Sequence, residues 1–475
     1  MRRLFTALWI FFVAVGAVHA QDDERLDVLF IAIDDLNDWV GVLGGHPQAK
    51  TPNIDALAER GISFTNAHSV AALCNPSRTA LMLGLRPSTT GIYGNAPSWM
   101  DVEGLAELPT LPRFLRERGY RTYGAGKIFH AATFREPLFS GYNDPAAWDA
   151  FYPSLGRQLP DEVGPPERPA NGNPIDYRFD WGPVVVDDRA MGDGQVVAAA
   201  ERRILADGNG PRFVAVGIYR PHLPWYVPQK YLDMHPLDQI ELPTVLESDL
   251  DDVPLIGQQF QQNSFLPPMD LHRWVVAADT WRDGVQAYLA SVSFADAMVG
   301  RVLDALEQSG RADRTIIILW SDHGWHLGEK LRWRKTTLWE ESTRVPLIVV
   351  APDVTTPGSR SARTVSLIDL FPTLTELLGI EAPSYLEGTS LVPLLEDPDA
   401  PWNYPAISTF GFGNHAVRTE QFRYIRYSDG SEELYDHETD PNEWTNLAAD
   451  PTYAGVKAEL GELLPRENAP DAYYR

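Results

Sequence analysis

Cys74 is the single cysteine in this chain of 475 residues, within the sequence Cys-Asn-Pro-Ser-Arg at 74–78. A lone cysteine cannot form an intramolecular disulfide, so it is either an inert buried thiol or a reactive group. Pro76 and the apolar stretch 79–83 predict a helix that begins just after Cys74. Because a helix N-terminus favours an anion and Arg78 can fold back toward it, this arrangement would suit a thiolate nucleophile.

Two pairs of candidate metal ligands follow apolar runs of strand length. Asp34 and Asp35 come after residues 28–33, and Asp322 and His323 come shortly after residues 315–320. Adjacent carboxylates repel each other unless a cation lies between them, and an oxygen-rich set with one imidazole favours calcium or magnesium over zinc. The alternative interpretation of two adjacent aspartates at a strand end is a turn or a helix cap.

Other polar side chains follow similar runs. Lys127 and His130 come after the run 120–124, and His222 comes after the run 213–219. Apolar runs without alternation are typical of strands buried on both faces, and helical patterns lie at 51–61, 286–306 and 367–378. The sequence therefore predicts an α/β fold with a mainly parallel sheet between helices. Ligands bind beyond the carboxyl ends of such strands, so we expect these side chains to converge on one site.

The pattern changes after about residue 398. Short strands are predicted at 406–410, 416–418, 422–427 and 433–435, with a closing helix at 456–464. We therefore expect a catalytic domain at 21–398 and a C-terminal subdomain at 399–475, built on a small antiparallel sheet. Residues 137–188 and 249–273 are rich in turn formers and are predicted to be surface excursions.

Residues 1–20 have the pattern of a secretory signal peptide: two arginines, an apolar run and a small residue at Ala20. Cleavage there predicts a secreted or periplasmic protein with no membrane attachment. The alternative is an uncleaved anchor, although the apolar run is shorter than the ~20 residues that a membrane span needs. A net charge of −25 argues against binding of nucleic acid and of anionic membranes. It also opposes binding of a polyanionic substrate, so any anion site must be locally basic. The stretch 330–335 holds four basic residues, which ordinarily form a solvated loop.

The sequence at 74–78 resembles the formylglycine signature of the sulfatase family, in its iduronate-2-sulfatase-like branch. Further matching segments stand in order around it, at 33–36, 51–55, 126–130, 220–222, 321–325 and 433–447. The resemblance covers about residues 27 to 450 and implies an alkaline-phosphatase-like fold. The family signature usually continues with Thr-Gly-Arg, whereas residues 83–85 are Leu-Gly-Leu and Arg86 follows.

The resemblance implies hydrolysis of a sulfate ester by the hydrate of a formylglycine made from Cys74, with bound Ca²⁺ or Mg²⁺. A formylglycine-generating enzyme would then be a partner during maturation. The implied metal ligands are Asp34, Asp35, Cys74, Asp322 and His323. Arg78 and Lys127 would stabilise the developing oxyanion, His130 would accept a proton, and His222 and Lys335 would bind sulfate oxygens. His222 is also the candidate acid for the leaving alcohol.

The implied substrate is an O-sulfated sugar of a polysaccharide or its oligosaccharides. Two alternatives stay open: a phosphonate or phosphate ester hydrolase of the same superfamily, and a catalytically silent polyanion-binding protein. Trp225, Tyr226, Trp325 and Trp333 lie near the motifs, where aromatic side chains either stack on sugars or belong to the core. Additional candidates for binding a substrate carboxylate or a second sulfate are His326, Arg332, Arg334 and His415.

Overall fold

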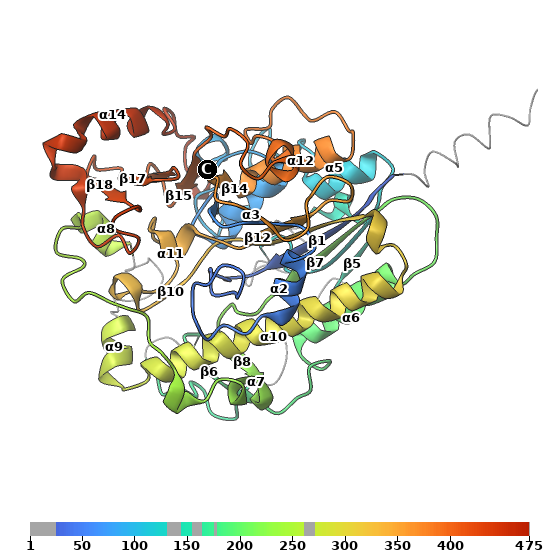
Figure 1. The fold of residues 1–475 in the computed structure, drawn as a ribbon, viewed down its shortest axis with the longest axis horizontal. Coiled ribbons are helices and arrows are strands. Elements are labelled where there is room, and N and C mark those ends of the chain that lie inside the picture. Colours follow the sequence, from blue (N-terminus) through green and yellow to red (C-terminus); the bar gives the residue numbers. More distant parts are fainter. Residues whose placement is uncertain (1–24, 131–143, 154–163, 175–177, 261–270, 475) are drawn as a thin grey trace, which may run out of the picture.

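The computed structural model describes residues 25–130, 144–153, 164–174, 178–260 and 271–474 (Figure 1). An eight-stranded sheet forms its centre, in the order β13-β2-β12-β9-β1-β7-β4-β5. Neighbouring strands are parallel except at β12, which pairs antiparallel with both β9 and β2. The strands are β1 (Asp27–Ile33), β2 (Ile62–Phe64), β4 (Arg121–Gly126), β5 (Ala150–Tyr152), β7 (Arg212–Ile218), β9 (Thr315–Ser321), β12 (Leu347–Val350) and β13 (Ser359–Ser361).

Helices cover both faces of this sheet (Figure 1). Leu29, Ile31 and Ile33 of β1 share one core with α2 (Pro52–Ala58), α6 (Gly192–Ile204) and α10 (Trp281–Gln308). The intervening residues of β1 share the opposite core with α3 (Cys74–Leu83), α5 (Leu111–Glu117) and α12 (Leu370–Leu377). Since both faces are buried, both sets of side chains must be apolar, which explains the absence of alternation. The predicted layered α/β architecture is confirmed.

The four predicted core strands match β1, β4, β7 and β9 to within two residues. The predicted helix 286–306 is α10, which already begins at Trp281. Gly284 interrupts the helical pattern in the sequence, yet it lies inside the first turns of α10. A Cβ at this position would be 2.8 Å from the Trp333 ring, which leaves no room for a larger side chain. Packing against Trp333 therefore requires a glycine at a position where helix propensity alone argues against one.

The predicted C-terminal sheet is confirmed. Its four antiparallel strands are β15 (Ala406–Thr409), β16 (His415–Arg418), β17 (Phe422–Arg426) and β18 (Glu432–Asp436). Helix α14 (Ala454–Glu462) lies against it, and Leu460 packs on Val417 and Tyr424. The domain boundary at residue 398 stays a prediction.

The prediction of a surface excursion at 137–188 is wrong in part. Phe179 and Trp181 are buried in the main core, and β6 (Trp181–Val184) pairs in parallel with β8 (Trp225–Pro228). The many turn-forming residues around Phe179 and Trp181 gave no indication in the sequence that these two side chains are buried. The segment 249–273 contains α8 (Leu255–Gln259) and the start of α9 (Leu271–Ala277). Residues 131–143, 154–163, 175–177 and 261–270 lie outside the described residues, as does the predicted signal peptide. Among the described residues, no helix has both the length and the apolarity needed to cross a membrane.

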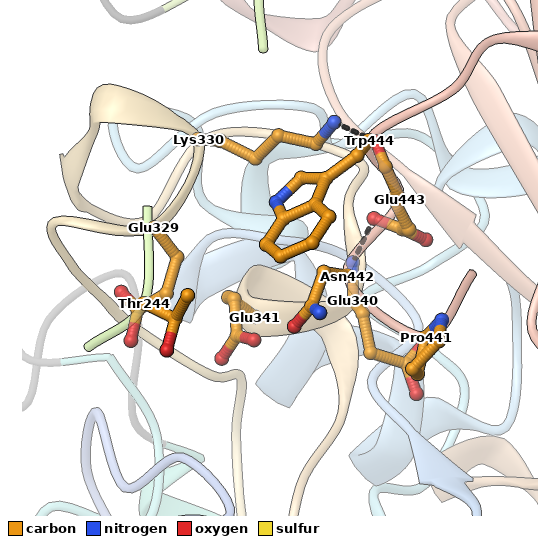
Figure 2. A pocket seen from close by; sticks show the side chains of 9 residues that line it. All are labelled: Thr244, Glu329, Lys330, Glu340, Glu341, Pro441, Asn442, Glu443 and Trp444. Atoms are coloured by element: carbon orange, nitrogen blue, oxygen red, sulfur yellow. Dashed lines mark hydrogen bonds between the residues drawn. The ribbon is translucent and has the colours of Figure 1, made fainter. Parts of the chain in front are cut away.

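A buried ionic cluster joins the C-terminal sheet to helix α11 (Glu340–Thr343). The Glu340 carboxylate accepts hydrogen bonds from Arg418 and Arg423, and Glu443 pairs with Arg423 and with His437 at 3.0 Å. Glu443 also bonds to Glu340 and Lys330 (Figure 2). Its carboxylate accepts the Glu340 N–H at 2.9 Å, and its backbone carbonyl oxygen accepts a hydrogen bond from Lys330. These contacts fix α11 to the C-terminal region.

Lys330 also pairs with Asp249 at 2.7 Å and is only 3% exposed. The interpretation of 330–335 as a solvated basic loop is therefore wrong. Its first lysine neutralises a buried carboxylate, and it holds together the segment 249–273, the loop after β9 and the C-terminal region.

Helix α11 in turn packs behind the loop that follows β9. The Gly324 N–H donates to the Ser342 carbonyl at 2.9 Å, and a Cβ on Gly324 would lie 2.0 Å from the Glu341 carbonyl oxygen. Only glycine fits this close approach of two backbones. The ionic cluster thereby supports the segment that carries Asp322 and His323.

The ionic cluster predicts acid-sensitive stability. Burial would raise the pKa of Glu443, but Arg423 and His437 lower it to about 2. A carboxyl whose folded pKa is depressed stabilises the protein above its unfolded pKa of about 4.3, and this stabilisation is lost as the pH falls toward 2. Replacing Glu443 by Gln removes one of the two carboxylates that neutralise Arg423, so we expect the free energy of unfolding to fall by about 3–5 kcal/mol at pH 7. Urea unfolding between pH 7 and pH 3 measures this change.

The matched control is Glu459→Gln, at an exposed position of α14, where we expect a change below about 0.5 kcal/mol. The difference between unmutated protein and Glu443→Gln should shrink below pH 4.3, because Glu443 then takes up a proton in the unfolded chain while it stays ionised in the folded protein, and the glutamine variant has no such proton to bind. A difference that stayed constant down to pH 3 would contradict this account.

Candidate active site

The carboxyl ends of β1, β4, β7 and β9 lie side by side because these strands run parallel. Ile33 is level with Ile218 on one side and with Ser321 on the other. The next residues, Asp34 and Asp322, are therefore neighbours at one edge of the sheet, and both are fully buried. The convergence that the sequence predicts is confirmed for these strand ends.

Helix α3 brings Cys74 and Arg78 to the same edge. It begins at Cys74, as the sequence predicts to within one residue, and all of its residues are buried. The Ser77 hydroxyl donates to the Asp322 carbonyl oxygen at 2.6 Å, which fixes the first turn against the end of β9. One turn along the helix, Arg78 donates to the Asp322 carboxylate at 2.7 Å and to Asp34 at 3.2 Å. Arg78 thus links the two aspartates.

Three buried carboxylates face three cationic side chains. Asp34 accepts from Lys127 as well as from Arg78, and Asp35 accepts from Lys335 at 2.5 Å. Burial raises the pKa of Asp34 well above its ordinary value, although the Lys127 charge opposes this shift. Burial acts in the same direction on Asp322, but Arg78 holds the pKa of that carboxyl below its ordinary value. The cluster is therefore held by charge pairing that compensates the cost of burying the carboxylates.

The Cys74 sulfur lies in the middle of these groups. His323 Nε2 is 3.2 Å from Cys74 Sγ, and Lys335 Nζ is 3.3 Å from it. Burial alone would raise the pKa of the thiol, yet the charges of Lys127 and Lys335 and a hydrogen bond from His130 hold it well below its ordinary value. Position 74 therefore favours an anionic group.

The same residues fit a divalent cation. Ligand atoms of Asp34, Cys74, Asp322 and His323 all lie within 4.8 Å of one another. The nearest Asp35 oxygen is 3.4 Å from His323 Nε2. The other oxygen, Oδ2, is buried and has no hydrogen-bond partner among the described residues. A bound cation would provide the missing interaction. The donor set of carboxylate oxygens with one imidazole is typical of a hard cation.

The two remaining histidines lie at the same site. His222 Nε2 is 3.9 Å from the free Asp35 oxygen, and His222 Nδ1 is 2.6 Å from the Leu223 carbonyl. Since only a protonated Nδ1 can donate to that carbonyl, Nε2 of the neutral ring faces the site as an acceptor. Burial lowers the pKa of His222 and lowers that of His130 to about 4, so both rings are neutral at pH 7.

The cluster opens to solvent beside His222. Its side chain is 24% exposed, compared with 10% for Lys335 and 5% for Lys127. Asp193, on α6, fixes the start of the segment that carries His222. Its carboxylate accepts hydrogen bonds from the backbone N–H groups of Tyr219 and Arg220 at 2.6 and 3.0 Å.

Several candidates from the sequence lie elsewhere. His326 is fully buried and bonds to Thr337 at 2.8 Å, whereas His415 is buried between Thr409 and Asn468. Arg332 donates to the Gln258 carbonyl, and Arg334 lies over the Phe179 ring. These contacts lie outside the cluster around Cys74. The four aromatic candidates are at most 2% exposed and belong to the core, so the stacking interpretation is wrong for Trp225, Tyr226, Trp325 and Trp333.

Two residues that contact the site were missed by the sequence reasoning. The Tyr288 hydroxyl on α10 donates to the Asp35 carbonyl at 2.9 Å, and Asn37 bonds to that hydroxyl and to the Trp325 carbonyl. Asn37 lies two residues from Asp35, which was a usable signal. Tyr288 is one aromatic residue in a helix that is apolar on its core side, and nothing in its local sequence distinguishes it.

Comparisons with known proteins agree with this geometry. The family model "Sulfatase" matches residues 27–380, and the model "N-sulphoglucosamine sulphohydrolase, C-terminal" matches residues 328–469. Among solved structures, the phosphonate monoester hydrolase of Agrobacterium radiobacter superposes with a TM-score of 0.76 at 24% identity, covering 92% of this chain and 94% of that one. A structure in complex with its substrate D-glucosamine-2-N,6-O-disulfate has a TM-score of 0.70 at 24% identity, covering 93% and 97%. Both show a shared fold.

Two curated relatives are similar over most of their length. A sulfatase from Formosa agariphila is 39% identical over 94% of this chain and 88% of its own. Human iduronate 2-sulfatase is 30% identical over 76% of this chain and 70% of its own. The chain therefore belongs to the sulfatase family, whose members hydrolyse sulfuric esters, and its resemblance to iduronate 2-sulfatase is confirmed.

Proposed function

We propose that this protein hydrolyses an O-sulfate ester on a sugar of a sulfated polysaccharide or of its oligosaccharides, with position 74 as the nucleophile. The observation that carries the proposal is the position of Cys74 Sγ, 3.2 Å from His323 and 3.3 Å from Lys335, among carboxylates able to hold a cation. Iduronate 2-sulfatase and the structure bound to a glucosamine disulfate are named for sugar substrates, which supports the sugar class.

We propose that Cys74 is converted to formylglycine by a formylglycine-generating enzyme. Hydration of this aldehyde supplies a hydroxyl nucleophile, which a thiol alone would not. Cys74 is 1% exposed and all of α3 is buried, so the modifying enzyme must act before folding is complete. Leu83 and Leu85, where the family has Thr and Arg, lie in an apolar cluster with Ile92 and Trp99. A basic residue at position 85 would be buried there, which gives a local packing reason for the departure.

The metal site is proposed for Ca²⁺, with Mg²⁺ as the alternative. Asp34, Asp35, Asp322, His323 and the modified residue 74 would hold the ion. When bound, it lowers the pKa of an oxygen nucleophile and neutralises sulfate charge. Zinc is disfavoured because the set has one imidazole and no cysteine thiolate after modification.

The surrounding side chains have separable tasks in this proposal. Arg78 and Lys127 fix Asp34 and hold positive charge beside position 74, which stabilises an anionic transition state. Lys335, within 3.3 Å of Cys74 Sγ, would bind a sulfate oxygen. His130 would accept a proton from residue 74, because its pKa of about 4 keeps the ring neutral. His222 would donate a proton to the departing alcohol only after its Nε2, an acceptor in the neutral ring, has taken up a proton, which the negative charge of a bound sulfate favours.

Two other functions are distinguishable from this one. A phosphonate or phosphate ester hydrolase is suggested by the name of the Agrobacterium enzyme with the same fold. Matched sulfate and phosphate monoesters separate these activities, and faster phosphate turnover would reverse our ranking. A silent polyanion-binding protein would bind sulfated glycans without turnover even when position 74 is fully modified.

Export is also proposed, since residues 1–20 have the composition of a cleaved signal and a polysaccharide substrate is too large to enter a cell intact. Expression in a bacterial host with its periplasm intact tests this. We expect mature protein in the periplasm or medium, starting at Gln21. Intact residues 1–20 on a membrane-bound product would favour the uncleaved anchor.

Cys74→Ala should abolish free sulfate release from a panel of sulfated glycans and their oligosaccharides. We expect a loss of at least about 1,000-fold in kcat/KM, because the nucleophile is removed. The protein is co-produced with a formylglycine-generating enzyme, and peptide mass confirms the modification. Equal sulfate release by Cys74→Ala would exclude position 74 as the nucleophile. No release by fully modified protein, with turnover of phosphate esters, would instead favour the phosphatase alternative.

Asp322→Asn should weaken both metal binding and catalysis. The amide keeps the shape of the side chain but removes the negative charge that pairs with Arg78 and that would also bind the cation. We therefore expect at least about a 10-fold loss in metal affinity. Chelator treatment of unmutated protein should abolish sulfate release, and Ca²⁺ should restore it. Asp313→Asn, at an exposed position before β9, is the matched control and should behave like unmutated protein. Full activity in excess chelator would refute the metal role.

A further inference from the structure

Asp35 has an uncommon backbone conformation. Its φ of 59° lies in the left-handed region, which a residue with a Cβ adopts only when neighbouring groups fix it. The Asp34 N–H still donates to the Ile218 carbonyl at 3.1 Å and so continues the sheet, which means that the chain turns away at Asp35. This turn lets two adjacent carboxylates contact the same cluster, Asp34 through Lys127 and Asp35 through Lys335.

Side chains from two distant segments hold both backbone polar groups of this turn. The Asp35 N–H donates to Asp322 Oδ1 at 3.2 Å. The Asp35 carbonyl oxygen accepts from the Tyr288 hydroxyl at 2.9 Å. Tyr288 belongs to α10 and is fully buried, and its ring packs edge-on against Trp39 and Trp225 at centroid distances of 5.5 and 5.4 Å. The hydroxyl is therefore held in place by the packing of its own ring.

Asn37 extends this connection to the second ligand-bearing segment. Its backbone N–H donates to the Tyr288 hydroxyl oxygen at 3.0 Å, and its side-chain amide donates to the Trp325 carbonyl at 3.1 Å. Trp325 follows His323 by two residues. One hydroxyl and one amide therefore join the turn of Asp34 and Asp35 to the loop of Asp322 and His323.

We infer that Tyr288 and Asn37 are positioning residues, which hold the two carboxylate-bearing segments at the separation that a divalent cation needs. The inference rests on the metal site proposed above. A phenylalanine at position 288 would fill the same space, so the hydroxyl is not required for packing. Without it, the Asp35 carbonyl and the Asn37 N–H lose their shared partner, and the left-handed turn loses one of its two tethers.

Tyr288→Phe tests the inference by calcium titration in a calorimeter, on folded, formylglycine-modified protein stripped with chelator. We expect the Kd for Ca²⁺ to rise about 10- to 100-fold, as for other groups that orient metal ligands. Excess Ca²⁺ should restore most of the sulfate release. The melting temperature without metal should change little, whereas its rise on adding a fixed, low Ca²⁺ concentration should become smaller.

Tyr231→Phe is the matched control. Tyr231 is 4% exposed and donates its hydroxyl to Asp188 at 2.9 Å, so the same atom is removed from a buried ring outside the ligand cluster. We expect its calcium affinity to equal that of unmutated protein. Asn37→Ala is the second variant, which removes the bond to Trp325 and the Asn37 Oδ1 atom 3.0 Å from the Tyr288 hydroxyl but keeps the Tyr288 bond to Asp35. It should weaken calcium binding in the same direction.

The outcomes separate this inference from the metal proposal. Calcium affinity unchanged in both Tyr288→Phe and Asn37→Ala would overturn the positioning role and leave the metal site intact. Equal losses of melting temperature with and without metal, at unchanged affinity, would show a purely structural tyrosine. Absence of Ca²⁺ and Mg²⁺ binding by the unmutated protein would overturn the metal proposal and this inference together.

Discussion

The structure depends on the burial of three carboxylates at the ends of two adjacent strands. Asp34, Asp35 and Asp322 are fully buried, and ionised groups in such surroundings are stable only when opposite charges lie beside them. Those charges come from separate parts of the chain: Arg78 from α3, Lys127 after β4 and Lys335 from the loop after β9. The site exists because the fold brings these elements to one edge of the sheet.

This charge balance also determines the environment of position 74. The cations that neutralise the aspartates surround Cys74 as well, so negative charge at this position is favoured before any substrate arrives. Stability and catalysis therefore use the same pairs. The neutral histidines His130 and His222 add proton acceptors without adding charge to the cluster. The His222 side chain, 24% exposed, faces solvent more than Lys127 and Lys335 do.

The sequence predicted the parts of this arrangement that are local. Apolar runs gave the core strands, and polar residues immediately after them gave Asp34, Asp322 and Lys127. Burial of individual side chains was less predictable. Trp333 and Lys330 lie in a basic stretch that appears solvated in the sequence, yet one fills the core beside Gly284 and the other neutralises Asp249. Tyr288 was missed because its role arises from a contact 253 residues away, at Asp35, which no local pattern records.

The pairing of Glu340 with Arg418 and Arg423 crosses the border that the sequence places near residue 398. Helix α11 carries one half of this pairing, and its backbone touches Gly324, next to His323. A chain cut at the border would leave the buried Glu340 carboxylate without these two arginines, directly behind the loop that carries Asp322 and His323. The C-terminal sheet is therefore not a module that can be exchanged between relatives while the rest stays constant. Its arginines and the glutamate that they neutralise would have to be exchanged together.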